Sequence, residues 1–266
     1  MRYQRLITIV TIFLFLSACQ SSGSHEPDDS SQTQHNPAAA AFNVQLGLSY
    51  LNEKLMERSK HKLLKALEQD PNSATTNGAM AYYLEVTANI PQADAYYRKA
   101  ISFAEDKGPA LNNYGGFLCR QKQYQNAEQY FLRAVAVPTY VRSSEAYENA
   151  GLCELKLPNI AKAKQYFQRA LEQDPKRSSS LYELARLALE ENQLTLAKQY
   201  LNQYSQSGEL DLTGAELGLK IARRVGESDQ AATYVMMIQK FKQQAKATAD
   251  QQDPTANNNT TRAGEI

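Results

Sequence analysis

The sequence predicts an all-α protein built from about six helical hairpins that stack as a solenoid. The pentapeptide Leu-Glu-Gln-Asp-Pro occurs at residues 67–71 and again at residues 171–175. Comparing the chain with itself then gives a period of about 34 residues. The same region is rich in Ala, Leu, Gln, Lys and Glu and lacks long alternating β-branched runs. This composition favours helices over strands.

The N-terminal residues predict an export signal that ends at a lipid attachment site. Arg2 and Arg5 form a short positive segment, and residues 6–16 are an apolar stretch of eleven residues. A membrane-spanning helix needs about 20 residues, so this shorter run is typical of a signal peptide. Leu-Ser-Ala-Cys at 16–19 resembles the bacterial lipobox. Residues 1–18 are therefore predicted to be removed and Cys19 to carry a covalent lipid; an ordinary signal with an incidental cysteine is the alternative.

The composition of the mature chain indicates where it acts. No Asp follows Cys19 directly, which in the enterobacterial sorting rule favours the periplasmic face of the outer membrane. Residues 19–39 and 246–266 are polar, and we expect a flexible tether and a disordered tail. About 20 tether residues give an r.m.s. reach of roughly 25 Å. Without residues 1–18, the chain has 27 basic and 28 acidic side chains, so no basic field attracts nucleic acid.

Residues 40–245 are predicted to form the repeats, at about 40–73, 74–107, 108–143, 144–177, 178–211 and 212–245. A small residue recurs at spacings of 34, 34, 36, 34 and 34, at Ser59, Ala93, Ala127, Ala163, Ala197 and Ala231. Four positions after each comes a large apolar residue: Leu63, Tyr97, Phe131, Phe167, Leu201 and Val235. Twelve positions before each small residue stand Gly47, Ala81, Gly115, Gly151, Ala185 and Leu219. Small side chains let two helices approach closely. The pattern resembles the tetratricopeptide repeat, a helix–turn–helix unit of about 34 residues.

The tetratricopeptide resemblance implies a right-handed superhelix whose first helices line a concave face. Such a face is a binding groove rather than an active site. The candidates, taken from the family's inward positions, are Val44, Leu48, Leu51, Gly78, Tyr82, Glu85, Asn112, Gly116, Arg120, Glu148, Leu152, Tyr182 and Arg186. Each is alternatively a packing or solvated residue, so the set is the prediction. Its aliphatic part near repeats 1 and 2 is expected to receive a helical or extended segment.

Two cysteines remain besides Cys19. Cys119 lies four residues after Gly115 and Cys153 two residues after Gly151, so they occupy non-equivalent positions on neighbouring first helices. Packed helices lie about 8–10 Å apart, whereas a disulfide needs Cα atoms about 4.4–6.8 Å apart. The offset can place the side chains within reach, and we predict a Cys119–Cys153 bridge between repeats 3 and 4. The alternative is two buried thiols that act as small hydrophobes. A metal site is disfavoured because two sulfurs give too few ligands.

The segments around these cysteines resemble one family beyond the repeat consensus. Three segments and the lipobox carry the resemblance: residues 111–140 (LNNYGGFLCRQKQYQNAEQYFLRAVAVPTY), 149–156 (NAGLCELK) and 215–241. Together they are similar to the type IV pilus biogenesis/stability lipoproteins, the PilF/PilW pilotin family. The resemblance extends to about Phe241 and departs at Gly218, where a large aromatic residue is expected. It implies an outer-membrane lipoprotein that binds the secretin of the type IV pilus and promotes its localisation and multimerisation.

Two other classes of function, an envelope adaptor and an enzyme, have less support in the sequence. Repeat-bearing outer-membrane lipoproteins also act as adaptors for peptidoglycan hydrolases or envelope assembly machinery, and the fold alone does not distinguish them. An enzyme is disfavoured because the chain has only three histidines, His25, His35 and His61, and neither a catalytic triad nor a glycine-rich phosphate loop. We expect a monomer without a cofactor or metal, since a monomer is the default for a capped solenoid.

Overall fold

The computed structural model describes residues 35–157, 159–208 and 210–252, with side chains described as far as Thr248. All regular structure in this part is helical, in twelve helices. The helices are α2 (Pro37–Asn52), α3 (Met56–Gln69), α4 (Ala74–Val86), α5 (Ile90–Phe103), α6 (Lys107–Arg120), α7 (Tyr124–Val135), α8 (Ser143–Glu154), α9 (Ile160–Gln173), α10 (Ser178–Glu190), α11 (Leu194–Ser207), α12 (Leu212–Val225) and α13 (Ser228–Gln252). Consecutive helices pack as six pairs, which confirms the predicted all-α solenoid.

The pairs pack through the residues that carry the sequence period. Ser59, Ala93, Ala127, Ala163 and Ala197 are all 0% exposed. The large residues one turn later, Leu63, Tyr97, Phe131, Phe167 and Leu201, are at most 3% exposed. A glycine on the first helix makes room for the ring or branch on the second. A Cβ added to Gly151, for example, would lie 2.7 Å from a ring carbon of Phe167.

The sixth pair corrects the predicted register by one residue. Gly218, not Leu219, makes the close approach on α12, because a Cβ there would lie 2.5 Å from Tyr234. Tyr234 thus fills the space assigned to Val235, and Ala231 is only half-buried. Gly218 follows Ala185, the corresponding residue of α10, by 33 residues instead of 34, and this shorter spacing accounts for the shift. Gly218 therefore replaces the expected aromatic residue because the helix pair needs a glycine at this position.

Both ends of the repeat region extend beyond the predicted limits of 40 and 245. α2 begins at Pro37, inside the predicted tether, because Pro occupies the first turn and the Asn36 side chain accepts a hydrogen bond from Ala39 N at 3.0 Å. α13 continues to Gln252, inside the predicted tail. Five of residues 246–252 are the good helix formers Lys, Ala and Gln, and α13 contains no proline. Cys19 and residues 253–266 lie outside the described residues.

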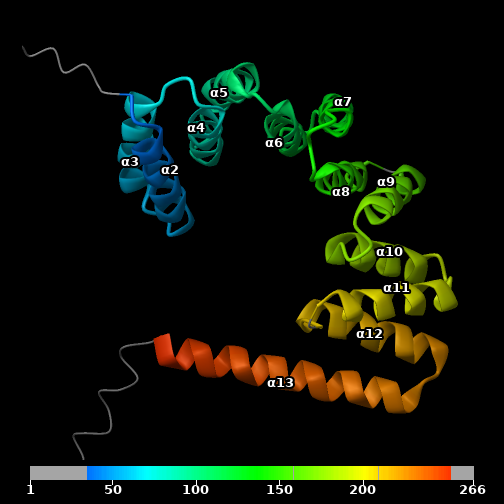
Figure 1. Ribbon diagram of the computed structural model, residues 1–266. Coiled ribbons are helices and arrows are strands. Elements are labelled where there is room, and N and C mark those ends of the chain that lie inside the picture. The colour runs from blue at the N-terminus through cyan, green and yellow to red at the C-terminus, as the bar shows by residue number, and fades with distance from the viewer. Residues whose placement is uncertain (1–34, 158, 209, 253–266) are drawn as a thin grey trace, which may run out of the picture.

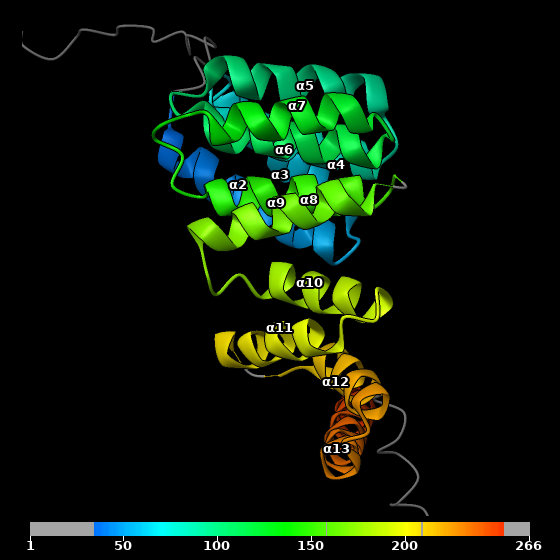
Figure 2. The ribbon, with the colours of Figure 1, turned by 90° about the vertical axis from the view of Figure 1, so that its right-hand side faces the viewer.

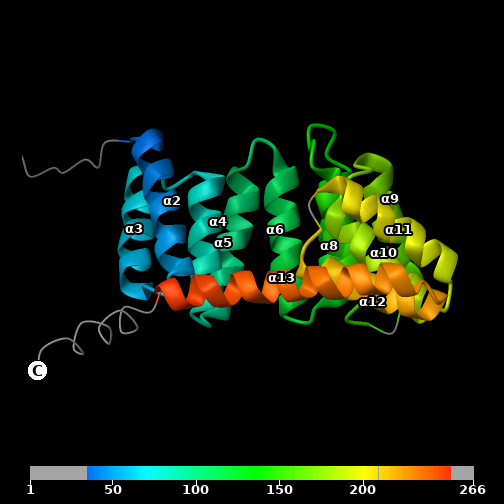
Figure 3. The same cartoon turned by 90° about the horizontal axis from the view of Figure 1, so that it is seen from below.

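The helix pairs follow an arc (Figure 1). Neighbouring first helices α2, α4, α6 and α8 touch one another along its inner side. In Figure 2, α9 and α10 run across the view whereas α13 is seen nearly end-on, so the stack twists along its length. α13 runs back beneath the open side of the arc towards the end that carries α2 and α3 (Figures 1 and 3). Within the described ranges, no helix has the length and apolarity needed to cross a membrane.

Candidate functional site

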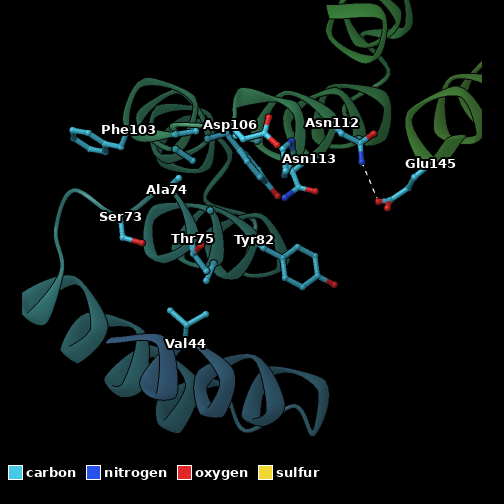
Figure 4. A pocket seen from close by; sticks show the side chains of 18 of the residues that line it. Val44, Ser73, Ala74, Thr75, Tyr82, Phe103, Asp106, Asn112, Asn113 and Glu145 are labelled. Atoms are coloured by element: carbon cyan, nitrogen blue, oxygen red, sulfur yellow. Dashed lines mark hydrogen bonds between the residues drawn. The ribbon is translucent and has the colours of Figure 1, made fainter. Parts of the chain in front are cut away.

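The inner side of the first four pairs forms a groove of about 970 Å³. Its lining comes mainly from α2, α4, α6 and α8 and from the loops that precede α4 and α6. Val44 on α2 points towards Thr75 and Tyr82 of α4 (Figure 4). Leu48, one turn after Val44, also lines the groove. Because every repeat contributes its first helix to the inner side, the repeat period brings these distant residues together.

The groove has an apolar part between α2 and α4. Val44 is buried, Leu48 is half-buried, and Tyr82 is 41% exposed with its ring over the opening. Phe103, at the end of α5, is 39% exposed and lines the same groove. A partly exposed aromatic ring beside aliphatic side chains offers apolar area that a bound segment would remove from water.

Hydrogen bonds between polar side chains connect α6 to α8. Asn112 Nδ2 donates to Glu145 Oε1 at 3.1 Å, and Asn149 Nδ2 donates to Asn112 Oδ1 at 3.0 Å. Figure 4 shows the first of these contacts across the groove wall. Asn112 is 2% exposed, so its amide is committed to these neighbours. Asn149 lines the groove but was not predicted from the sequence, although its sequence separation from Asn112 is close to one repeat period.

An ion pair joins α4 to α6. Arg120 Nε lies 2.5 Å from Glu85 Oε1, and Arg120 Nη2 lies 2.9 Å from Glu85 Oε2. Tyr97 Oη donates a third hydrogen bond to Glu85 at 2.9 Å. Burial, and then the negative charge of Glu85, raise the pKa of Tyr97. The hydrogen bond that Arg120 donates to Glu85 raises the pKa of Arg120. The Arg120 side chain is half exposed at the groove, whereas its partner Glu85 is buried.

Charged groups are unevenly placed along the groove. Four carboxylates, Asp70, Glu105, Asp106 and Glu145, lie at the edge where α4, α6 and α8 begin. Arg120 and Lys156 lie at the opposite edge, where α6 and α8 end. Several of the acids also serve the fold, since Asp106 accepts from Gly108 N at 3.0 Å as the cap of α6.

Cys119 and Cys153 join two walls of the groove. Their sulfur atoms are 2.14 Å apart and their Cα atoms 5.9 Å apart, within disulfide distance. The bond connects α6 to α8 across a sequence separation of 34 residues. Both cysteines line the groove, and Cys153 is 3% exposed.

The structure places eight of the predicted groove residues along this groove. Val44, Leu48, Gly78, Tyr82, Asn112, Gly116, Arg120 and Leu152 line it. Glu85 is absent from the lining but positions Arg120. Phe103, Asp70, Glu105 and Asp106 were not predicted because they lie on α5 or in loops, where the inward positions of first helices give no signal. Asn149 and Glu145 lie on the first helix α8, at positions outside the predicted inward set.

Four predicted groove residues have other roles. Leu51 is 5% exposed and packs in the core. Glu148 is 6% exposed and accepts hydrogen bonds from Arg177 at 3.0 Å and Ser180 at 2.9 Å, which ties α8 to α10.

The other two lie on α10, beyond the last helix of the groove. Tyr182 packs near Tyr204, with ring centroids 6.0 Å apart. Arg186 pairs with Glu183 at 2.7 Å and Glu190 at 2.6 Å. Neither residue is among those that line the groove, whose lining ends at α8 and the residues just after it.

The architecture defines a tetratricopeptide-repeat protein. Residues 108–176 and 156–211 match the tetratricopeptide-repeat family. The chain belongs more narrowly to the PilF family: it is 33% identical to the type IV pilus assembly protein PilF of Pseudomonas aeruginosa over 237 residues, which are 89% of this chain and 93% of that protein. Members of this family are repeat scaffolds, and this chain is accordingly a scaffold and not an enzyme.

Two solved structures support the same assignment. A structure of Pseudomonas aeruginosa PilF aligns with a TM-score of 0.64 and 35% identity, covering 76% of this chain and 91% of that one. The crystal structure of PilW, a type IV pilus biogenesis factor, aligns with a TM-score of 0.63 and 28% identity, covering 77% of this chain and 94% of that one.

Proposed function

We propose that this protein is a pilotin of type IV pilus biogenesis. It binds the secretin, the ring through which the pilus passes, and promotes the localisation of that ring to the outer membrane and its multimerisation. The observation that carries the proposal is similarity to PilF along nearly the whole chain, combined with a groove across the first four repeats. The role therefore divides between an anchor and a recognition surface.

Cys19 provides the anchor. The lipobox at residues 16–19 supports lipidation, and signal cleavage leaves Cys19 as the first residue of the mature chain. Each buried CH₂ of a lipid contributes about 0.8 kcal/mol, so two or three acyl chains hold a protein on a membrane stably. The lipoprotein is retained on the periplasmic face of the outer membrane, where the secretin ring assembles.

The groove provides recognition. Val44, Leu48 and Tyr82 form the part that receives a helical or extended segment of the secretin, because they combine aliphatic area with an accessible ring. The periplasm is an oxidising compartment, so Cys119 and Cys153 are disulfide-bonded in the working protein. That bond keeps the α6 and α8 walls of the groove in register.

Membrane fractionation tests both parts in cells. We compare a deletion strain, a Cys19→Ser strain, a Leu48→Glu/Tyr82→Glu strain and a matched Leu64→Glu/Val141→Glu strain, and blot for the heat-resistant secretin multimer. Leu64 and Val141 are 44% and 93% exposed and do not line the groove. The multimer should disappear in the deletion and in the groove variant and persist in the matched variant. With Cys19→Ser it should vanish or remain in the inner membrane.

Normal secretin rings in the deletion strain would refute the pilotin role. Co-purification of peptidoglycan hydrolases in place of the secretin would support the adaptor function instead. Normal rings in the groove variant alone, with its circular dichroism unchanged, would contradict only the position of the recognition surface.

A further inference from the structure

The N-terminal end of the solenoid carries an apolar stripe beside a basic stripe. The apolar stripe consists of Phe42, Leu46 and Tyr50 on α2, and the basic stripe of Arg58, Lys62 and Lys65 on α3. We call these six residues the end face. In an inner repeat, a neighbouring pair would cover such a surface, but α2 and α3 are the first pair of the described arc (Figures 1 and 3).

The apolar stripe points away from the groove. Phe42, Leu46 and Tyr50 are spaced by four residues and so lie along one side of α2. Val44 and Leu48, which line the groove, are each two positions away from a member of the stripe, or about 160° around the helix. Phe42 is 64% exposed, and Leu46 and Tyr50 are half-buried.

The basic stripe runs directly beside it. Arg58, Lys62 and Lys65 are spaced by four and three residues, which places them on one side of α3. The guanidinium carbon of Arg58 lies 5.9 Å from the centre of the Tyr50 ring. Within the described part of the chain, none of the three cations forms an ion pair.

The acidic residues of α3 lie on another side of the helix. The charge of Glu57 contributes to the raised pKa of Tyr83 on α4, after the larger effect of burial, so Glu57 faces the second repeat. Glu68 follows Glu57 by about three helical turns and lies on the same side. Glu68 lies three residues after Lys65, but no ion pair joins them among the described residues, so the three cations give the end face a net positive charge.

The end face lies beside the point where the N-terminal segment enters the fold. Asn36 N donates to Gln69 O at 3.0 Å, which joins the start of α2 to the end of α3. Cys19, the proposed lipid site, precedes Asn36 by a short stretch of the predicted tether. A lipid at Cys19 would thus hold the end face at an r.m.s. distance of roughly 25 Å from the membrane.

We propose that the end face binds the anionic phospholipid surface of the membrane to which the protein is anchored. Arg58, Lys62 and Lys65 contact phosphate groups, and Phe42 inserts at the boundary between headgroups and acyl chains. The inference goes beyond the proposed function and relies on its lipid anchor for proximity. The contact fixes the α2–α3 pair against the membrane. Because the groove lies on the other side of α2, it then faces away from the membrane.

Vesicle flotation of the unlipidated chain tests this contact without the anchor. Residues 19–266 with Cys19→Ser are mixed with vesicles of phosphatidylethanolamine and phosphatidylglycerol, or with phosphatidylcholine vesicles. Each cation near an anionic surface contributes about a fivefold factor, so Arg58→Gln/Lys62→Gln/Lys65→Gln should lower partitioning onto the anionic vesicles on the order of a hundredfold. Phe42→Ser should lower it severalfold.

The matched control neutralises three exposed cations at the other end of the chain. Lys240, Lys242 and Lys246 on α13 are also exposed, and their triple Gln variant should partition like the parent chain. Equal loss in both triple variants, or no preference of the parent for anionic vesicles, would overturn the proposal. The proposal would also be overturned if the Arg58/Lys62/Lys65 variant bound vesicles normally but no longer captured the secretin. In that case the end face would bind a protein and not the membrane. Because the vesicle readout contains no secretin, failure of the pilotin role would leave it intact.

Discussion

Breaking the Cys119–Cys153 bond should destabilise the protein by an amount that follows from chain entropy. The bond closes a loop with a sequence separation of 34 residues. A cross-link across such a loop lowers the entropy of the unfolded chain by about 12.6 cal/mol/K, which is about 3.8 kcal/mol at 25 °C. This is a large share of the roughly 5–15 kcal/mol that is typical of a folded domain. The cost applies to repeats 3 and 4, because the bond connects α6 and α8.

Urea unfolding followed by helix circular dichroism measures this free energy. Wild type is compared with Cys119→Ala/Cys153→Ala, each with and without reductant. Alanine is chosen because Cys153 is 3% exposed and a serine hydroxyl there would need a partner. With an m value of roughly 2–3 kcal/mol/M, the urea midpoint of the variant should lie about 1–2 M below that of oxidised wild type.

Reduction of wild type provides the matched control. Reductant should lower the wild-type midpoint nearly to that of the variant and leave the variant unchanged, because the two then differ only by two small side chains. If oxidised and reduced wild type unfold at the same urea concentration, the loop-closure reasoning is wrong for this pair of repeats.

Two further predictions concern packing and charge. Gly151→Ala should lower the free energy of unfolding by about 1–2 kcal/mol in urea melts, since the new Cβ meets Phe167 at 2.7 Å. Gly78→Ala, where the nearest atom is 3.9 Å away, should instead stabilise the helix by up to ~1 kcal/mol, and equal effects would contradict the packing argument. Burial tends to raise the pKa of Glu128, because it opposes ionisation. The hydrogen bonds that Glu128 accepts, first of all from Lys162, have a larger effect and lower its pKa. This stability is fully present above the ordinary glutamate pKa and is lost progressively as the pH falls below it towards the lowered pKa of the folded state, so Glu128→Gln should flatten the fall in urea midpoint on acidification.

The sequence predicted the contacts within each pair because these depend on local spacing. Phe131 and Phe167 belong to successive repeats, yet each fits against the glycine that precedes it by sixteen positions. The same rule could have located the sixth pair, since Gly218 precedes Tyr234 by sixteen as well. A constant spacing of 34 places this position at Leu219, but Gly218 follows Ala185 by only 33 residues.

The sequence could not predict which inward positions form the groove, because the twist between pairs decides it. Glu85 and Glu148 were both assigned to the groove from their place on first helices. Glu85 supports Arg120 beside the groove, whereas Glu148 is buried against Arg177 and Ser180. Each acid pairs with a basic residue of the following repeat, so the relative rotation of the repeats sets its exposure. The repeat period alone contains no information on that rotation.

The cross-links of the groove are concentrated at one end, and this bears on how it works. From α4 to α8 the walls are joined by the Glu85–Arg120 pair, the Asn112–Asn149 hydrogen bond and the Cys119–Cys153 bond. Between α2 and α4, the groove is lined by the apolar side chain of Val44 and the partly exposed ring of Tyr82. Dispersion and apolar contacts tolerate small shifts better than a covalent bond does. The α2–α4 part can therefore accommodate a small shift between helices at lower cost than the α4–α8 part, where the covalent bond and the ion pair would have to change.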